Sequence, residues 1–517
     1  MLPLPDCDFS TQLAAQLRQH GSRPALIDPD GESLNYADLG AAIAQWRGAL
    51  AATGCQPGDR VVVWANKRSN TAVVLLAIWA MGLVAVPLHP ALRPAQVRRL
   101  LERAGAQRLI TDAVHSQLLG LPHPEPDALY ISHAPFTESA PPRWDAPLPP
   151  DPTYAAQDLA ALLFTSGSTG EPKGVMVTRA NLAAGAAAVS GYLGLQPDDR
   201  VAAVLPLSFD YGLSQLTTAL WVGAAVVLVD YLLSNDLKAP LLHGGITTLA
   251  GTPGLLIPLA RQHWLAEAGA LRRITNSGGS LPVATVRALR AARPQTQVFL
   301  MYGLTEAFRA SFLPPDQTDA FPNSIGAAFS ASVLGLVDDC GRLLTEPVAE
   351  GELVQGGALV TAGYWQDPAA TALRFRPPPA GWPNPLDERV VFSGDRVRRD
   401  AAGRLYFVGR LDEQIKVQGI RISPEEIEAA AARHPAVIEA LAFGYTEGEN
   451  ARIALVVAPE SVPSDTLRRF LQAELAPFQW PHRIETWPNL PRSANGKLDR
   501  GAARGRLFPP QNESKNP

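Results

Sequence analysis

Apolar residues form short continuous runs that alternate with longer stretches of helical length. The runs at residues 84–88 and 225–229 are almost wholly apolar, and each follows a stretch that is long enough for a helix. A run without apolar/polar alternation is typical of a parallel strand that is buried on both faces. The pattern therefore predicts an α/β fold in which helices cover parallel sheets.

The chain contains an internal repeat: the same succession of sequence patterns occurs near residues 54–88 and again near residues 194–229. The first stretch begins GCQPGDRV and the second begins GLQPDDRV, and each continues as apolar strand, helix, glycine and second apolar strand. This repetition predicts two β-α-β units. We assign both units to a large N-terminal domain that covers residues 1–411.

The character of the chain changes after Arg410. Ser423 stands at a predicted N-cap, Pro424 takes the first helical position, and acidic residues follow. Strand patterns at 437–443 and 453–457 and a helical pattern at 466–475 complete a predicted small α+β domain over residues 412–510. The polar residues 511–517 predict a disordered tail.

Bulk properties narrow the possible functions. The chain has 517 residues, of which 46% are hydrophobic and 18% are charged, and a formal net charge of -4. It can bury large cores, and it carries no general basic field that would favour nucleic acid. The three cysteines are far apart in sequence, and the N-terminus has no basic segment followed by an apolar one as a secretory signal would, so we expect a cytoplasmic protein. Gly82 and Pro87 interrupt the apolar stretch at residues 72–88, which argues against a membrane-spanning helix there.

The segment from Thr165 to Gly174 carries the strongest chemical signal. It reads TSGSTGEPKG and directly follows the apolar run LAALLF. Glycine backbone, hydroxyl groups and the positive charge of Lys173 suit a loop that binds polyphosphate. A Walker loop would need Ser or Thr after the lysine, where Gly174 stands. A flexible Ser/Gly linker is the alternative, but the PKG ending argues against it.

Four more segments follow in order, and with this loop they resemble the AMP-forming adenylating enzymes of the ANL superfamily. They read MYGLTE at 301–306, SGD at 393–395, GRLDEQIK at 409–416 and PRSANGK at 491–497. The whole chain is also similar to AMP-forming ligases found with exosortase gene clusters. The resemblance implies a large domain of β-α-β subdomains and a β-rich subdomain, with a small mobile C-terminal domain.

The resemblance also assigns roles to residues of this sequence. It implies that ATP is bound and that Lys497 stabilises the charge that develops during adenylation. Tyr302 and the pair Gly278 and Gly279 would lie near adenine, while Thr305 would approach the α-phosphate and Glu306 would hold Mg²⁺. Asp395 would accept hydrogen bonds from both ribose hydroxyls, and Arg410 would contact ribose or phosphate. The residues implied for the β- and γ-phosphates are Thr165, Ser166, Gly167, Ser168, Thr169, Gly170 and Lys173.

Structural alternatives exist for the main members of this set. Glu306 could cap a helix that begins at Thr305, and Asp395 could be a turn residue after a glycine. Lys497 could be a solvated lysine near the C-terminus. The resemblance also identifies Asp412 as a hinge on which the small domain turns after adenylation, so that a thiol can reach the acyl-adenylate.

Phe209, Asp210 and Tyr211 bear on the choice of acid. Many acyl-CoA ligases carry histidine in this segment, whereas amino-acid adenylation domains carry Phe-Asp, whose aspartate pairs with the ammonium group. Asp210 therefore favours an amino or imino acid, since a buried carboxylate needs a partner. Leu304 stands where amino-acid adenylation domains usually have proline, which keeps a fatty or aryl acid open.

The predicted activity is adenylation of a small carboxylic acid, followed by transfer to a thiol. No carrier module follows Lys497 in this sequence, so the acceptor would be CoA or the phosphopantetheine of a stand-alone carrier protein. A non-catalytic nucleotide-binding protein is the alternative from another class. It would be favoured by loss of the Thr165 loop, Glu306 or Lys497, all of which are present.

Overall fold

The computed structural model describes residues 7–120, 128–131, 155–165, 171–411, 415–491 and 498–508. The chain divides into two compact units. The first comprises Met1–Pro90, Val97–Phe164 and Lys173–Leu411, and the second comprises Ala91–Gln96, Thr165–Pro172 and Asp412–Pro517. The predicted tail at 511–517 lies outside the described residues. In the described part of the chain, no helix is long and apolar enough to cross a membrane.

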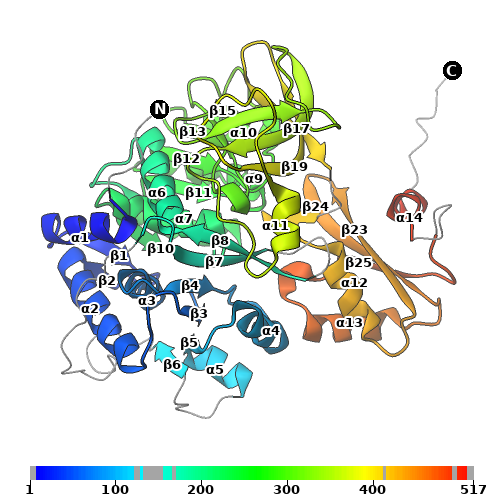
Figure 1. The fold of residues 1–517 in the computed structure, drawn as a ribbon, viewed down its shortest axis with the longest axis horizontal. Coiled ribbons are helices and arrows are strands. Elements are labelled where there is room, and N and C mark those ends of the chain that lie inside the picture. The colour runs from blue at the N-terminus through cyan, green and yellow to red at the C-terminus, as the bar shows by residue number, and fades with distance from the viewer. Residues whose placement is uncertain are drawn as a thin grey trace. The chain divides into compact units, whose positions relative to one another are not determined.

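The first sheet contains the first predicted β-α-β unit. Its strand order is β6-β5-β3-β4-β7-β8, and β3 pairs in parallel with both β4 and β5. Figure 1 shows its early elements in blue and cyan. The strands are β3 (Arg60–Trp64), β4 (Val84–Pro87), β5 (Arg108–Asp112), β6 (Ala128–Ile131), β7 (Leu159–Thr165) and β8 (Lys173–Thr178). Its connecting helices are α3 (Ser69–Ala80), α4 (Pro94–Ala104) and α5 (Ala113–Leu119).

The second sheet contains the second predicted unit. Its order is β15-β14-β13-β12-β11-β9-β10-β1-β2. The strands are β1 (Pro24–Ile27), β2 (Ser33–Asn35), β9 (Arg200–Ala203), β10 (Ala225–Leu228), β11 (Thr248–Gly251), β12 (Arg273–Asn276), β13 (Gln297–Tyr302), β14 (Ser311–Leu313) and β15 (Ala327–Ala328). The helical segments that accompany it are α1 (Phe9–Gln19), α2 (Tyr36–Ala52), α6 (Arg179–Leu193), α7 (Asp210–Trp221), η1 (Ser234–Leu237), α8 (Lys238–His243), α9 (Pro253–Ala260), η2 (His263–Glu267), α10 (Val283–Ala292) and η3 (Thr305–Ala307).

The two repeats fold alike down to the turn that precedes each first strand. The backbone N–H of Gln56 donates to Asp59 Oδ2 at 2.8 Å, and that of Gln196 donates to Asp199 Oδ2 at 2.8 Å. In each repeat a helix leads to a parallel partner strand, β4 beside β3 and β10 beside β9. The predicted β-α-β units with parallel sheets are therefore confirmed.

A third, antiparallel sheet forms the predicted β-rich part of the first unit. Its order is β16-β17-β19-β18, with β20 paired to β19. These strands are β16 (Val333–Val337), β17 (Ala349–Gly356), β18 (Phe375–Arg376), β19 (Val390–Arg399) and β20 (Leu405–Arg410), and α11 (Pro368–Arg374) precedes β18. The pairing of β19 with β20 sets Asp395 opposite Arg410.

The second unit is a small α+β structure with its own apolar core. Two antiparallel strands, β23 and β24, are joined in parallel by β25. Its described elements are β21 (Ile415–Val417), β22 (Ile420–Ile422), α12 (Pro424–Ala432), β23 (Glu439–Glu447), β24 (Asn450–Ala458), α13 (Ser464–Glu474), η4 (Pro477–Gln479), β25 (Arg483–Thr486) and α14 (Arg500–Leu507).

The start of α12 differs in one detail from the prediction. Ser423 stands at the N-cap position and Pro424 begins the helix, as expected. The Ser423 hydroxyl, however, donates to Glu425 Oε2 at 2.5 Å instead of accepting from the helix backbone. The hydroxyl therefore makes a charge-assisted hydrogen bond to a carboxylate, and no cap hydrogen bond from the described backbone of α12 to that hydroxyl is present.

Candidate active site

Several predicted site residues follow the carboxyl ends of parallel strands in the second sheet, in which β9, β11, β12 and β13 lie side by side in that order. Asp210 comes after β9, Gly278 and Gly279 come after β12, and Glu306 comes after β13. The register pairs Gly251 with Asn276 and Asn276 with Leu300, so these strands end at one edge of the sheet. Ligands of open parallel sheets bind at this edge.

Glu306 is held beside Tyr364 and within reach of the Lys173 segment. The Glu306 side chain is buried, and its Oε1 accepts from the Tyr364 hydroxyl at 2.8 Å. The Lys173 ammonium lies 5.1 Å from the centre of the same tyrosine ring. This arrangement follows from backbone pairing, because Gly174 accepts from Trp365 and Met176 pairs with the segment around residue 363. Lys173 and Glu306, which are far apart in sequence, thus share one aromatic neighbour.

Asp395 forms a second group with Tyr302 and Arg410. An Arg410 Nη1 atom lies 2.6 Å from Asp395 Oδ1, and the Tyr302 hydroxyl donates to Asp395 Oδ2. The carboxylate is 3% exposed. Because Tyr302 lies four positions before Glu306 on the same strand-to-turn segment, the two groups are joined through β13 and η3. A carboxylate in this place can accept hydrogen bonds from the two hydroxyls of a ribose.

Asp210 begins α7 and does not stand alone. Its Oδ2 lies 3.3 Å from Nη1 of Arg309, and both side chains are buried. The guanidinium also lies over the Tyr211 ring, 4.6 Å from its centre. The Tyr211 hydroxyl contacts Thr275 Oγ1 at 2.6 Å, and burial raises the pKa of this phenol above its usual value. The predicted substrate residue Asp210 therefore already has a cationic neighbour.

The turn that carries Arg309 has an unusual backbone. Phe308 adopts φ 45, which is rare for a bulky residue. A Cβ on Gly303 would lie 2.5 Å from the Phe308 carbonyl oxygen, so glycine is required there. Gln355 Nε2 donates to the carbonyl of Arg309 at 2.7 Å. Strained residues of this kind persist where surrounding structure fixes them, and they cluster at binding sites.

The glycine pair shows why small residues are needed. Gly278 has φ 82, in the left-handed region. A Cβ on Gly279 would lie 3.0 Å from a ring carbon of Pro253. The carbonyl oxygen of Gly279 accepts a hydrogen bond from Asn276 Nδ2 at 2.9 Å. This segment can pass close to a flat ligand only without side chains.

Some predicted residues lie outside the described part of the chain. They are Ser166, Gly167, Ser168, Thr169, Gly170, Asp412 and Lys497. Of the loop, Thr165 ends β7 and Lys173 begins β8. Phe209 immediately precedes α7 as its N-cap residue, and Thr305 opens η3. The roles of all these residues stay predictions.

The sequence prediction did not include Arg309 or Tyr364. Arg309 follows Glu306 by three positions, and a charge inside the apolar segment AFRAS was a signal for burial with a partner. Tyr364 carries no comparable signal. Its contact with Glu306 joins residues that are 58 positions apart, so only the tertiary structure identifies it.

The family resemblance implies a Mg²⁺ ion, and the described side chains show whether suitable oxygen ligands for it are present. Mg²⁺ typically takes one or two protein carboxylates together with phosphate oxygens. Among the described residues, no group of three or more His, Cys, Asp or Glu side chains could hold a metal by itself. A single buried carboxylate that shares the neighbour Tyr364 with Lys173 fits that ligand set, and Glu306 would supply it. The bound ion would neutralise phosphate charge.

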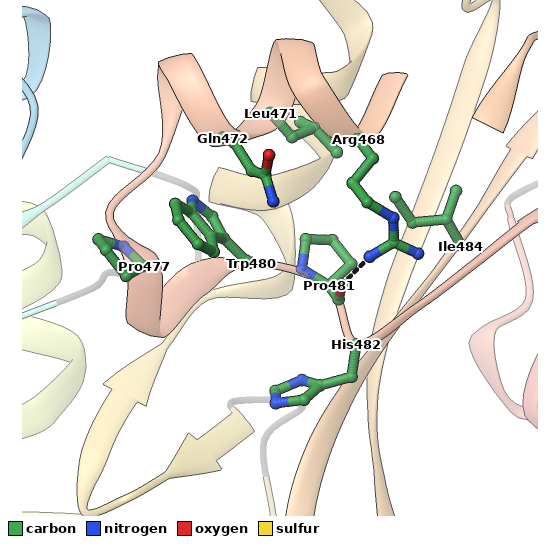
Figure 2. A pocket seen from close by; sticks show the side chains of 8 residues that line it. All are labelled: Arg468, Leu471, Gln472, Pro477, Trp480, Pro481, His482 and Ile484. Atoms are coloured by element: carbon green, nitrogen blue, oxygen red, sulfur yellow. Dashed lines mark hydrogen bonds between the residues drawn. The ribbon is translucent and has the colours of Figure 1, made fainter. Parts of the chain in front are cut away.

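A separate cavity of about 240 Å³ lies within the second unit. Figure 2 shows Trp480 and Pro477 at one end and Ile484 at the other, with Arg468 donating to the Pro481 carbonyl at 3.3 Å. Its remaining lining residues are Leu471, Gln472 and His482. None of these residues belongs to the predicted nucleotide site.

Comparison with known proteins gives relatives along nearly the whole chain. One is an L-proline--[L-prolyl-carrier protein] ligase of Streptomyces coelicolor, 33% identical over 93% of this chain and 93% of that protein. Another is a sulfoacetate--CoA ligase of Cupriavidus necator, 32% identical over 94% of this chain and 96% of that protein. The solved amide bond synthetase McbA of Marinactinospora thermotolerans has the same fold, with a TM-score of 0.84, 24% identity, and coverage of 97% and 100%.

The family comparison covers both units. Residues 13–365 match the AMP-binding enzyme family, and residues 426–497 match its C-terminal domain. The first match alone includes more than half of the chain, and the sheet-edge residues fall inside it. The resemblance based on motifs is therefore confirmed: the chain belongs to the AMP-binding enzymes of the ANL superfamily and is an AMP-forming, adenylate-forming ligase.

Proposed function

We propose that the enzyme activates an amino or imino acid and passes the acyl group to the phosphopantetheine thiol of a carrier protein. In the first step an oxygen of the acid attacks the α-phosphorus of ATP, and pyrophosphate leaves. In the second step the thiol attacks the acyl carbon, and AMP leaves. Lys497 would stabilise the developing charge in the first step, as the family motif implies.

The observation that carries the nature of the acid is the buried Asp210 carboxylate at the start of α7. It is 5% exposed and lies at the sheet edge where parallel folds bind ligands. A carboxylate has acceptor sites on both oxygens, so Asp210 can contact Arg309 and an ammonium group together. The name of the Streptomyces relative, a proline and carrier-protein ligase, supports the same substrate class.

A second candidate is a CoA ligase for an acid without an amino group. The sulfoacetate--CoA ligase relative matches this chain almost as well as the proline ligase does. Arg309 favours this candidate, because it already gives the Asp210 carboxylate a cationic partner, so no ammonium group of the substrate is needed. Matched pairs of acids with and without the amino group separate the two candidates.

The test is ATP–pyrophosphate exchange with a panel of amino, imino, fatty and aryl acids. We expect exchange with amino or imino acids and at least about tenfold lower kcat/KM with the corresponding acids that lack nitrogen. Asp210→Asn should reduce this discrimination while leaving ATP binding intact. Faster exchange with fatty or aryl acids would contradict an amino or imino acid as the substrate. A lack of exchange with every acid of the panel would contradict the adenylation activity itself.

The acceptor is tested separately with the acid that gives the fastest exchange. Thioester formation on a phosphopantetheinylated carrier protein should exceed formation on CoA at equal concentrations, measured by mass spectrometry. The same carrier without its phosphopantetheine arm is the control. Faster thioester formation on CoA would identify the enzyme as a CoA ligase.

A further inference from the structure

We propose that Arg309 binds a second anionic group of the substrate, so that the acid is an amino acid with an additional side-chain carboxylate. This inference rests on the proposed function, because it takes Asp210 as the partner of the substrate's ammonium group. It adds a recognition residue for the side chain and narrows the substrate to aspartate-like and glutamate-like acids.

The hydrogen bonding of Arg309 is incomplete. Its Nη1 atom donates to the Phe308 carbonyl at 2.7 Å and to Asp210 Oδ2 at 3.3 Å. Its Nε and Nη2 atoms are buried and make no hydrogen bond of good geometry to the described residues. The residue is 2% exposed. Buried charged donors without acceptors are costly, and a functional ligand is one reason why a protein retains them.

The neighbours of Arg309 supply at most part of the missing acceptors, because Tyr192 offers a single phenol oxygen to the three N–H groups of Nε and Nη2. Tyr211 presents its ring face to the guanidinium. Tyr192 donates its hydroxyl to Met301 Sδ at 3.0 Å, and burial raises the pKa of this phenol to about 12, although the charge of Arg309 and a hydrogen bond from its side chain lower it. Tyr192 is therefore neutral at physiological pH. Asp210 is the one carboxylate that the described contacts bring to this guanidinium.

Charge balance selects the class of substrate. Asp210 and Arg309 are a neutral pair, so an added ammonium group alone would leave an uncompensated positive charge in a buried place. The reacting carboxylate of the acid loses its charge when it forms the acyl-adenylate, so it no longer compensates the ammonium group after the first step. A side-chain carboxylate can compensate it, since a guanidinium presents paired N–H groups that match a carboxylate. An amino dicarboxylic acid therefore satisfies both protein charges.

The backbone around Arg309 holds the guanidinium in a defined place. Gln355 Nε2 contacts the carbonyls of Ala307 and Arg309 at 3.3 and 2.7 Å. Phe308 has a positive φ, and its carbonyl accepts from the Arg309 side chain itself. A binding group that is fixed in advance loses little conformational freedom when a ligand arrives.

The experiment compares acid and amide pairs in ATP–pyrophosphate exchange. Aspartate is measured against asparagine and glutamate against glutamine, with proline, alanine and succinate in the same panel. We expect the better acid of the two pairs to exceed its amide in kcat/KM at least tenfold, or about 1.4 kcal/mol. Arg309→Gln should remove this preference, and Arg309→Lys should keep part of it. Arg272→Gln, at a surface arginine that pairs with Asp198, is the control and should change nothing.

Each outcome separates this inference from the proposed function. Equal or better use of amides, proline or alanine would overturn the assignment of Arg309 but leave amino-acid activation standing. Equal use of succinate and aspartate would overturn the amino dicarboxylic acid and the ammonium role of Asp210. No exchange with any acid would overturn the activity itself. Should Arg309→Gln fail to fold, calorimetric binding of aspartate and asparagine to the unchanged enzyme decides the preference.

Discussion

At the scale of single residues, the candidate site is defined by buried charges and their partners. Asp395 has Arg410 and Tyr302, and Asp210 has Arg309. Burial of such groups costs free energy unless each finds a partner, and buried charge clusters of this kind occur often at functional sites. Tyr302 lies 93 positions from Asp395, and Arg309 lies 99 positions from Asp210 and was not part of the predicted site.

Lys497→Ala should lower the rate of ATP–pyrophosphate exchange by about 100-fold or more, because a charge that stabilises the transition state is lost. ATP binding, measured by calorimetry, should stay within a few-fold of the original. Lys238→Ala is a matched control, since Lys238 is an exposed lysine. Exchange that is unchanged in the Lys497 variant would remove the catalytic assignment of this lysine.

At the scale of elements, the turn before α7 positions Asp210 through close backbone packing. A Cβ on Gly212 would lie only 2.0 Å from the Pro206 carbonyl oxygen. Gly212→Ala must therefore shift the turn or the helix, and we expect destabilisation by about 1–3 kcal/mol together with reduced exchange activity. Thermal unfolding and pyrophosphate exchange measure the two effects.

Gly191→Ala in α6 is the control for this change. Apart from its chain neighbours and the backbone of its own helix, no described atom lies within 4 Å of a Cβ at Gly191, so the methyl group enters open space. The substitution should stabilise the helix by up to about 1 kcal/mol through helix propensity. Equal melting temperatures for the Gly212 and Gly191 variants would contradict the steric argument.

The N-terminus of α5 gives a pH-dependent prediction. Burial alone would raise the pKa of Asp112, but hydrogen bonds from His115 and Asn66 lower it to about 2. The carboxylate of Asp112 is ionised more readily in the folded protein than in the unfolded chain, where its pKa is near 4. Above that pH the ionised group stabilises the folded protein fully, and this stabilisation declines as the pH falls towards 2.

Asp112→Asn should accordingly reduce the free energy of unfolding most at neutral pH. The difference between the two proteins should shrink below about pH 4, where the unfolded chain of the original protein begins to take up a proton at this position. Urea unfolding at pH values from 7 to 3 measures it. A difference that is constant over this range would show that the charge of Asp112 contributes nothing.

At the scale of the whole molecule, the boundary between the two compact units falls between Leu411 and Asp412. The family resemblance makes Asp412 a hinge that is used after adenylation. Asp412→Pro restricts φ to about −65°, so we expect thioester formation to fall at least about tenfold while pyrophosphate exchange is retained. Asp412→Ala removes the carboxylate without this restriction and should preserve both steps. An equal loss of both activities in the proline variant would argue against a hinge that serves only the second step.

The sequence alone determined the architecture and the reaction class, because both depend on local patterns. The apolar runs at 84–88 and 225–229 became β4 and β10, and the repeated turns before Asp59 and Asp199 closed in the same way. Segments such as the one at 301–306 indicated an adenylating enzyme for the same reason, since each motif is a short run of neighbouring residues, and the match of residues 13–365 to the AMP-binding enzyme family confirmed it.

Only the tertiary structure decided which side chains meet. Arg309 reaches Asp210 across 99 positions, and Tyr364 reaches Glu306 across 58. Such contacts depend on the order and register of strands and on turns such as the one at Phe308, which no local pattern encodes. The reaction class could therefore be inferred from short motifs, whereas the pairing of Asp210 with Arg309 depends on residues that folding brings together.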